Sequence, residues 1–259
     1  MNQQKNIAIL GNGMVGSVLH QWFKQALVYD VVPQRRVHSL EEVNQQAEWV
    51  FVCVPTPFDQ QAKSFDLSLV EQAVESLNGK KVIIIKSTVL PGTTQKLQQK
   101  YTQHRFLVNP EFLTEKTAWQ DFVKPEMQLV GCVSKSDHKL AKKVLASLPQ
   151  AKLAKLVASQ TAEAVKYFRN CFYATKVVYA NQFFDFCQQQ QINYEQVKSI
   201  VKHDKMIAPY HLEIFHQGGR GAGGKCLAKD LAGFSKFSQL PLLKKVNKLN
   251  KQYLKTRKQ

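Results

Sequence analysis

The sequence has few cysteines and no closely spaced pair of them. Its five cysteines stand far apart without a CxxC motif, at Cys53, Cys132, Cys171, Cys187 and Cys226. This spacing argues against a disulfide framework and a zinc site, so no metal is expected. There is also no apolar run near the roughly 18 residues of a membrane-spanning helix, and the N-terminus lacks a signal-peptide pattern. A cytoplasmic protein without a membrane partner is expected.

Acidic residues are scarce. The chain of 259 residues has 19 Asp and Glu against 36 Lys and Arg, which gives a formal charge of +17. Such a charge permits anionic ligands or nucleic acid as partners but establishes neither. The hydrophobic fraction of 44% is that of a globular protein, and the length allows two modest domains.

The first half alternates short apolar runs with helical stretches, which predicts an α/β fold with a doubly wound, mostly parallel sheet of Rossmann type. Helices are expected at 68–77 and 138–148. The expected strands lie within 6–10, 26–30, 48–54, 81–86, 105–108 and 127–133.

The second half is expected to be helical. Residues 161–191 contain neither Gly nor Pro and carry apolar residues at helical spacing, which predicts one long helix. Further helices are expected near 194–203 and 228–239. Within 240–259 we expect a basic helix that faces solvent rather than one that binds nucleic acid. We place the domain boundary near residue 155, with a dinucleotide-binding domain at 1–155 and a helical domain at 156–259.

A GxGxxG motif follows the first expected strand. Gly11 would make the turn, Gly13 would let the backbone approach a pyrophosphate, and Gly16 would let the helix pack on the strand, with Met14 and Val15 in the first helical turn. Asp30 closes the second strand, where it would accept hydrogen bonds from the adenosine ribose. Because its carboxylate would repel a 2′-phosphate, NAD is favoured over NADP, although the nearby Arg35 and Arg36 weaken this preference. The alternative is that Asp30 is a turn residue before Pro33.

Other polar residues follow later strands. Thr56 and Thr88 come after the third and fourth strands, so they are expected at the cofactor-binding edge of the sheet or, equally well, as ordinary turn residues. Glu111 follows Asn109 and Pro110, a typical helix start. If that helix forms, Glu115 shares one face with Glu111, where paired carboxylates could serve as a base. The residues alone favour the simpler interpretation that Glu111 is an ordinary acid of a first helical turn.

The long helix carries Glu163, Lys166 and Asn170 on one face, where they could hold a developing alkoxide or simply face solvent. A glycine-rich segment at 216–230 has five glycines in positions 218 to 224 and ends in Cys226, Lys229 and Asp230. A helix N-terminus and neighbouring lysines would favour the Cys226 thiolate, so we interpret Cys226 as a nucleophile and the other four cysteines as inert.

A dinucleotide and a thiolate suggest oxidation of an alcohol through an aldehyde to an acid. The thiolate would form a thiohemiacetal and then a thioester, which water releases. A cation would hold the oxyanion and a carboxylate would activate water. Cys226, Lys166 with Asn170, and Glu115 or Asp230 supply this set.

With these residues the chain resembles the UDP-glucose/GDP-mannose dehydrogenase family. The matching motifs, in family order, are Gly11–Gly16, Val54-Pro-Thr-Pro57, Asp66-Leu-Ser68, Lys86-Ser-Thr88, Asn109-Pro-Glu-Phe-Leu113, Glu163-Ala-Val-Lys166 with Asn170, and Gly223-Gly-Lys-Cys226 through Asp230. The resemblance implies NAD-dependent, four-electron oxidation of a UDP-glucose-like sugar at its primary alcohol, which serves polysaccharide biosynthesis, and a homodimer built on the long helix.

The resemblance also implies a role for each site residue. Cys226 would be the thiolate, Lys166 and Asn170 would bind the reacting oxygen, Glu115 and Asp230 would handle water and protons, and Thr88 would lie beside the nicotinamide. Cofactor contacts would further include Glu115 and Lys229. The expected sugar and diphosphate contacts are Glu111, Phe215, Gly218, Gly219 and Gly223.

The sequence departs from the family in some places. Ala228 stands where the family commonly has Pro, and Ala222 replaces a common Phe. The chain also stops near the end of the family's central domain, so a separate chain that supplies the nucleotide-covering domain is one expectation. Two alternatives remain: a two-electron β-hydroxyacid dehydrogenase, which would not need Cys226, and a non-catalytic protein that binds NAD or nucleic acid.

Overall fold

The computed structural model describes residues 6–59, 64–207, 210–216, 219–224 and 226–256. The chain divides into two compact units. The first comprises Met1–Pro57 and Phe65–Lys166, and the second comprises Phe58–Ser64 and Tyr167–Gln259. The domain boundary near residue 155 stays a prediction; in the structure, position 155 lies within a strand of the first unit.

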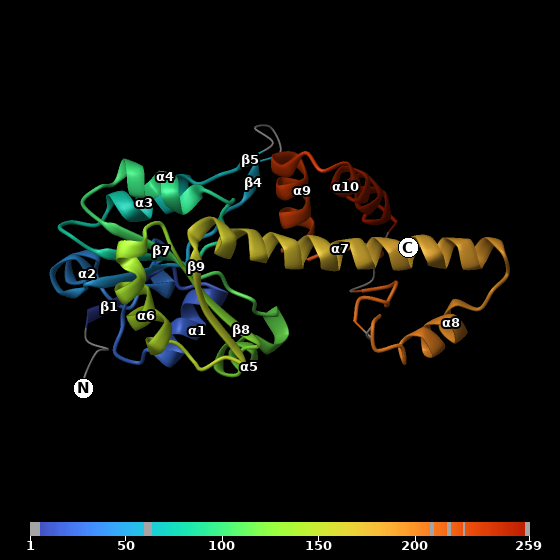
Figure 1. The fold of residues 1–259 in the computed structure, drawn as a ribbon, viewed down its shortest axis with the longest axis horizontal. Helices are drawn as coiled ribbons and strands as arrows, with labels where there is room; N and C mark the ends of the chain where they lie inside the picture. The colour runs from blue at the N-terminus through green and yellow to red at the C-terminus, as the bar shows by residue number, and fades with distance from the viewer. Residues whose placement is uncertain (1–5, 60–63, 208–209, 217–218, 225, 257–259) are drawn as a thin grey trace. The chain divides into compact units, whose positions relative to one another are not determined.

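The first unit is built on a seven-stranded sheet with the order β2-β1-β3-β6-β7-β8-β9. Figure 1 shows this sheet among the helices of the unit. Neighbouring strands pair in parallel except β7 and β8, which are antiparallel. The strands are β1 (Ile7–Leu10), β2 (Leu27–Tyr29), β3 (Trp49–Val52), β6 (Val82–Ile85), β7 (Arg105–Val108), β8 (Met127–Cys132) and β9 (Leu153–Ala158). The predicted Rossmann-type, mostly parallel sheet is confirmed.

Both faces of this sheet are buried, which explains the continuous apolar runs. Ala8 and Leu10 of β1 belong to the core on one face, while Ile7 and Ile9 belong to the core on the other. Alternate residues of a strand point to opposite faces, so each strand must be apolar throughout when helices cover both sides. The α-helices of this unit are α1 (Met14–Trp22), α2 (Leu40–Gln46), α3 (Ser68–Glu75), α4 (Thr93–Lys100), α5 (Ala118–Val123) and α6 (His138–Ser147).

The last strand of the sheet, β9, was not predicted. It lies at the end of the strand order, and several of its residues, including Leu153 and Lys155, are exposed. An edge strand needs no continuous apolar run, so the sequence carries little signal for it.

The second unit is mainly helical. The long helix α7 (Ser159–Gln189) starts in the first unit and continues through the second, close to the predicted range 161–191. It is followed by α8 (Tyr194–Val201), α9 (Leu227–Ser238) and α10 (Pro241–Tyr253). A two-stranded sheet of β4 (Phe58–Asp59) and β5 (Ser64–Phe65) was not predicted.

The core of the second unit joins three of these helices. Cys171 and Val178 of α7 pack with Leu231 of α9 and with Leu243 and Val246 of α10. Among the described residues, no helix combines the length and the hydrophobicity that crossing a membrane requires.

Candidate active site

The glycine motif forms a tight turn between β1 and α1. Gly11 has φ of +93°, and a Cβ there would lie 2.8 Å from the Cys53 carbonyl oxygen. A Cβ on Gly16 would lie 1.8 Å from the Gly11 oxygen, whereas a Cβ on Gly13 would meet nothing within 4 Å. Gly11 and Gly16 are therefore required by packing, while Gly13, the N-cap of α1, leaves open space before the helix. Met14 and Val15 follow as the first residues of α1. This turn fits a dinucleotide pyrophosphate, whose negative charge the start of a helix favours.

Asp30 is positioned at the end of β2 beside this turn. Its side chain is buried, with Oδ2 accepting a hydrogen bond from the Asn12 amide at 2.6 Å and Oδ1 accepting one from the Val32 amide at 2.8 Å. A carboxylate oxygen accepts more than one hydrogen bond, so a ribose hydroxyl can still donate to this group. The residues around the turn therefore fit an adenosine ribose as well as a pyrophosphate.

Two strand-end loops meet at the same edge of the sheet, as parallel pairing requires. Thr56, after β3, is buried and donates from Oγ1 to the Thr88 carbonyl oxygen at 2.7 Å. Ser87, after β6, donates from Oγ to the Val54 carbonyl oxygen at 2.6 Å. The hydroxyl groups of Thr56 and Ser87 thus fix the two loops together, while Thr88 itself is half-buried.

Lys166 and Glu111 form a buried ion pair in the first unit. The Lys166 Nζ also donates to the Glu111 carbonyl oxygen at 2.9 Å, and Glu111 Oε2 accepts from the Leu113 amide at 2.7 Å. Burial disfavours the charged form of Glu111, but the adjacent Lys166 ammonium outweighs it and holds the pKa of that carboxyl below its usual value. The structure thus holds the Lys166–Glu111 ion pair away from bulk water.

The predicted helix that would place Glu111 and Glu115 on one face is wrong. Residues 109–114 are not helical, and Glu115 is exposed at the start of a short 3₁₀ turn, Glu115–Thr117. Asn109 explains the difference, because its side chain points into the sheet and does not cap a helix. Its Oδ1 accepts from Lys86 Nζ at 2.7 Å and its Nδ2 donates to the Leu129 carbonyl oxygen at 2.7 Å.

Lys86 was not among the predicted site residues. It is fully buried after the apolar strand β6, and burial lowers the pKa of its ammonium to about 8. The sequence does carry a signal for Lys86, because it is a charged residue that directly follows an uninterrupted apolar strand.

The polar face of α7 is buried. Glu163, Lys166 and Asn170 are exposed by 1%, 4% and 4%, which excludes a solvated face. Glu163 accepts hydrogen bonds from the amides of Gly92 and Thr94, at 2.6 and 2.8 Å, and from the Thr94 hydroxyl. The Glu163 carboxylate therefore satisfies backbone donors at the start of α4, which is a structural role.

In the second unit, Asn170 holds a buried carboxylate. Its Nδ2 donates to Asp230 Oδ2 at 2.6 Å, and Lys229 Nζ lies 3.0 Å from Asp230 Oδ1. Asp230 is in the first turn of α9, and its amide donates to the carbonyl oxygen of Cys226, the N-cap residue. Cys226 is the one exposed cysteine; the other four are buried or half-buried. An exposed thiol at a helix start, one turn before a buried carboxylate, is a suitable arrangement for a nucleophile.

The glycine-rich loop is fastened to α10. Asn250 accepts from the Ala222 amide at 2.7 Å and donates to the Ala222 carbonyl oxygen at 3.1 Å. Gly221 has φ of +82°, and a Cβ there would lie 2.9 Å from Asn250 Oδ1. Asn250 was not a predicted site residue, and no local sequence signal marks it.

The remaining predicted residues lie in or near this loop. Phe215 is exposed, Gly219 bridges to His216, and Gly223 is half-buried. Gly218 lies outside the described residues.

The parallel sheet and its glycine turn define a dinucleotide-binding protein. The family model described as UDP-glucose/GDP-mannose dehydrogenase family, NAD binding domain, matches residues 24–148, and the model of the family's central domain matches residues 160–252. The chain belongs to this family, and the dinucleotide is NAD.

Individual relatives agree with this assignment. The chain is 32% identical over 249 residues to UDP-glucose 6-dehydrogenase of Rickettsia felis, covering 90% of this chain and 54% of the relative. It is 31% identical over 199 residues to the enzyme of the same name from Streptococcus pneumoniae, covering 73% and 49%. The chain thus spans about half the length of the curated relatives that it matches.

A solved structure also superposes well. The UDP-glucose dehydrogenase of Pyrobaculum islandicum has a TM-score of 0.82 at 25% identity, covering 96% of this chain and 68% of that one. The UDP-D-ManNAc dehydrogenase of Pyrococcus horikoshii, at 21% identity and a TM-score of 0.83, shows the same fold.

Proposed function

We propose that this chain carries the catalytic residues for oxidation of the primary alcohol of a nucleotide sugar, of the UDP-glucose type, to the uronic acid. Such acids are building blocks for polysaccharide biosynthesis. The proposal is supported by relatives named UDP-glucose 6-dehydrogenase. The observation that carries it is the exposed Cys226 thiol one turn before the buried Asp230, since a two-electron dehydrogenase needs no thiol.

NAD would supply the hydride acceptor, one molecule for each of the two oxidations. The backbone from Gly11 to Gly16 would hold its pyrophosphate, and Asp30 would accept hydrogen bonds from its ribose. Thr56, Thr88, Glu115 and Lys229 are proposed as further cofactor contacts.

Lys166 and Asn170 would hold the oxygen on the reacting carbon. Both side chains are buried, so hydrogen bonds to a developing oxyanion would be less weakened by water than at the surface. The ion pair with Glu111 fixes the position of the Lys166 ammonium. Glu111, Phe215, Gly218, Gly219 and Gly223 would contact the sugar and the diphosphate.

Cys226 would act once the alcohol has become an aldehyde. Its thiolate would add to the aldehyde carbon and form a carbon–sulfur bond, leaving the oxygen as an oxyanion for Lys166 and Asn170 to stabilise. The thiohemiacetal becomes a thioester in the second oxidation. Asp230 or Glu115 would then remove a proton from the attacking water, and hydrolysis would restore the thiol.

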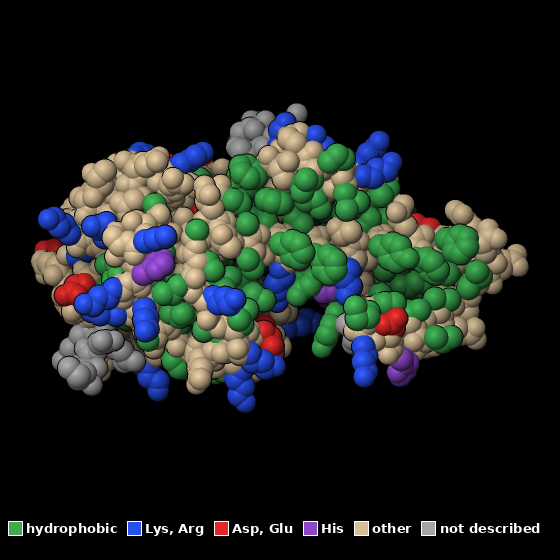
Figure 2. Space-filling view, in the orientation of Figure 1, with side chains coloured by type: hydrophobic (Ala, Val, Ile, Leu, Met, Phe, Trp, Pro, Cys, Tyr) green, Lys and Arg blue, Asp and Glu red, His purple; other side chains and the backbone are tan. Residues whose placement is uncertain are grey.

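The exposed face of α7 in the second unit supports a homodimer. Four aromatic side chains on this face are exposed and recur at spacings of 4 and 7 residues. Their exposed fractions are 75% for Phe168, 53% for Phe172, 66% for Tyr179 and 46% for Phe186. Figure 2 shows hydrophobic side chains gathered over this part of the molecule. An apolar stripe of this size is typical of a surface that another protein covers, and we propose a second copy of the chain.

The test of the activity is the stoichiometry of NADH release with a panel of UDP- and GDP-sugars. We expect two NADH per sugar oxidised by the wild-type chain. We also expect a loss of thioester formation in Cys226→Ser, with Cys187→Ser as a matched control. One NADH per sugar, together with an unimpaired Cys226→Ser variant, would instead indicate a two-electron dehydrogenase.

A further inference from the structure

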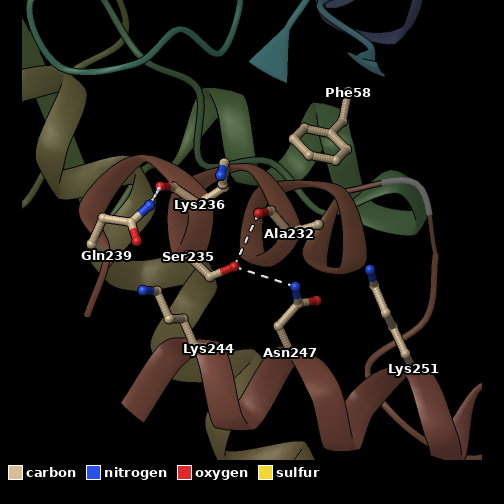
Figure 3. Close-up of a pocket in the computed structure, with 8 residues that line it drawn as sticks. All are labelled: Phe58, Ala232, Ser235, Lys236, Gln239, Lys244, Asn247 and Lys251. Carbon is tan, nitrogen blue, oxygen red and sulfur yellow. Dashed lines mark hydrogen bonds between the residues drawn. The ribbon is translucent and has the colours of Figure 1, made fainter. Parts of the chain in front are cut away.

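A cavity of about 340 Å³ lies between α9 and α10 in the second unit (Figure 3). This volume is within the usual range for pockets that bind small molecules. The residues that line it are Phe58, Ala232, Ser235, Lys236, Gln239, Lys244, Asn247 and Lys251. None of them belongs to the proposed catalytic or NAD-binding set, so the cavity is a separate feature.

The charge of the cavity has one sign. Lys236 of α9 and Lys244 and Lys251 of α10 line it, and none of the described lining residues is acidic. The sequence contains no Asp or Glu after Asp230, so no carboxylate of α10 or of the later part of α9 balances these charges. A concave surface that carries only positive charge raises the local concentration of anions.

The cavity also has a fixed polar floor. Ser235 is buried, and its Oγ donates to the Ala232 carbonyl oxygen at 3.0 Å and accepts from Asn247 Nδ2 at 3.3 Å. The bond from Asn247 joins α10 to α9. The shape of the floor therefore does not depend on the flexible lysine side chains.

One wall of the cavity is apolar. The Phe58 ring and Ala232 lie on the same side, and Figure 3 shows the ring facing the α9–α10 region. A planar ring packs well against an aromatic side chain. The cavity thus offers cations for a phosphate group together with an aromatic surface for a ring.

We propose that this cavity binds a small phosphorylated compound that carries a planar ring, of the nucleotide class. Lys236, Lys244 and Lys251 bind the phosphates, and the ring packs on Phe58. The ligand would touch α9 and α10, the two helices that are connected to the glycine-rich loop. Cys226, which follows the loop, is the N-cap of α9, and Asn250 of α10 accepts a hydrogen bond from the Ala222 amide.

The test is calorimetric titration of ATP into the protein saturated with NAD. Lys244→Gln/Lys251→Gln is compared with Lys245→Gln/Lys248→Gln, which removes the same charge from α10 at exposed positions outside the cavity. We expect the first variant to weaken ATP binding roughly tenfold and the second to change it little. An equal loss in both variants, no loss in either, or no saturable binding by the wild type would overturn the proposal.

A second comparison tests the ring. Phe58→Leu is expected to weaken ATP binding while binding of inorganic tripolyphosphate stays unchanged, and the melting temperature checks that this variant folds. If Phe58→Leu leaves ATP binding unaffected, the aromatic part of the proposal is wrong. A short oligothymidine tests the nucleic-acid alternative. If the wild type binds it and both lysine double variants lose this binding equally, the lysines serve nucleic-acid binding instead.

Discussion

Asn170 donates a hydrogen bond from Nδ2 to Asp230 Oδ2 at 2.6 Å and thereby links α7 to the first turn of α9. Both side chains are almost fully buried. A buried carboxylate is stable only when donors satisfy it, so this bond holds the proposed water-activating group one helical turn from the thiol.

Asn170→Asp should destabilise the second unit more than Asp230→Asn does. The first variant places two carboxylates in contact in a buried site, whereas the second keeps an oxygen that can accept from Asn170. We expect a loss of about 3 kcal/mol for Asn170→Asp and about 1 kcal/mol for Asp230→Asn in urea unfolding. If the urea concentration at the midpoint of unfolding is the same for Asn170→Asp as for the wild type, the two side chains are not in contact.

Gly16→Ala should impair folding, whereas Gly13→Ala should impair cofactor binding. Alanine at position 16 would collide with the Gly11 oxygen, so we expect a loss of stability of about 2 kcal/mol or more. Alanine at position 13 meets no protein atom and should leave the melting temperature within a few degrees of the wild type. It should nevertheless weaken NAD binding, measured by calorimetry, because the methyl group occupies the space proposed for the pyrophosphate.

Lys86 should make stability depend on pH in alkaline solution. Burial lowers the pKa of this ammonium to about 8 in the folded chain, against the usual 10.5. Between these two values the unfolded chain binds more protons, so the free energy of unfolding should rise with pH from about 8 to 10.5. The gain is about 3 kcal/mol at most.

Lys86→Met provides the comparison, since it removes the titrating group and keeps similar bulk. Urea unfolding of both proteins at several pH values isolates the contribution of Lys86. If the free energy of unfolding depends on pH in the same way for both proteins, the Lys86 ammonium has its ordinary pKa in the folded chain.

Cys226 should be the fastest-reacting thiol of the five. It is exposed, whereas burial raises the pKa of Cys53 and of Cys171 to about 12. Iodoacetamide should therefore modify one site rapidly in the native protein, and peptide mass spectrometry should locate it at Cys226. The rapid phase should vanish in Cys226→Ser and persist in Cys187→Ser; a rapid phase that survives the first change would refute the prediction.

The α7 stripe should control the oligomeric state. Phe172→Glu/Tyr179→Glu places two charges on the exposed aromatic face and should convert a dimer to a monomer, measured by light scattering after gel filtration. Ile200→Glu, at a residue of α8 that is 71% exposed, is the control and should leave the mass unchanged. A wild-type protein that is monomeric at every concentration tested would exclude the dimer.

Much of the fold was predictable because the signals are local. The strand after Asn6, its glycine turn and the following helix are contiguous in the sequence, and the absence of Gly and Pro from 161–191 marks the long helix. The edge strand β9 was missed because its exposed residues break the apolar pattern. The helix expected after Pro110 was wrong because a capping signature cannot reveal a distant partner, here Lys86, that draws Asn109 into the sheet.

The sequence alone determined the chemical inventory: a glycine turn for a dinucleotide, a lysine and an asparagine one helical turn apart, and a cysteine after a run of glycines. Tertiary structure decided which of these groups leave water and which partners they acquire. Glu111 pairs with Lys166, Glu163 binds the backbone at α4, and Asn250 fastens the glycine-rich loop. The physical reason is that desolvation and hydrogen bonding depend on neighbours brought together by folding, often from positions far apart in the chain.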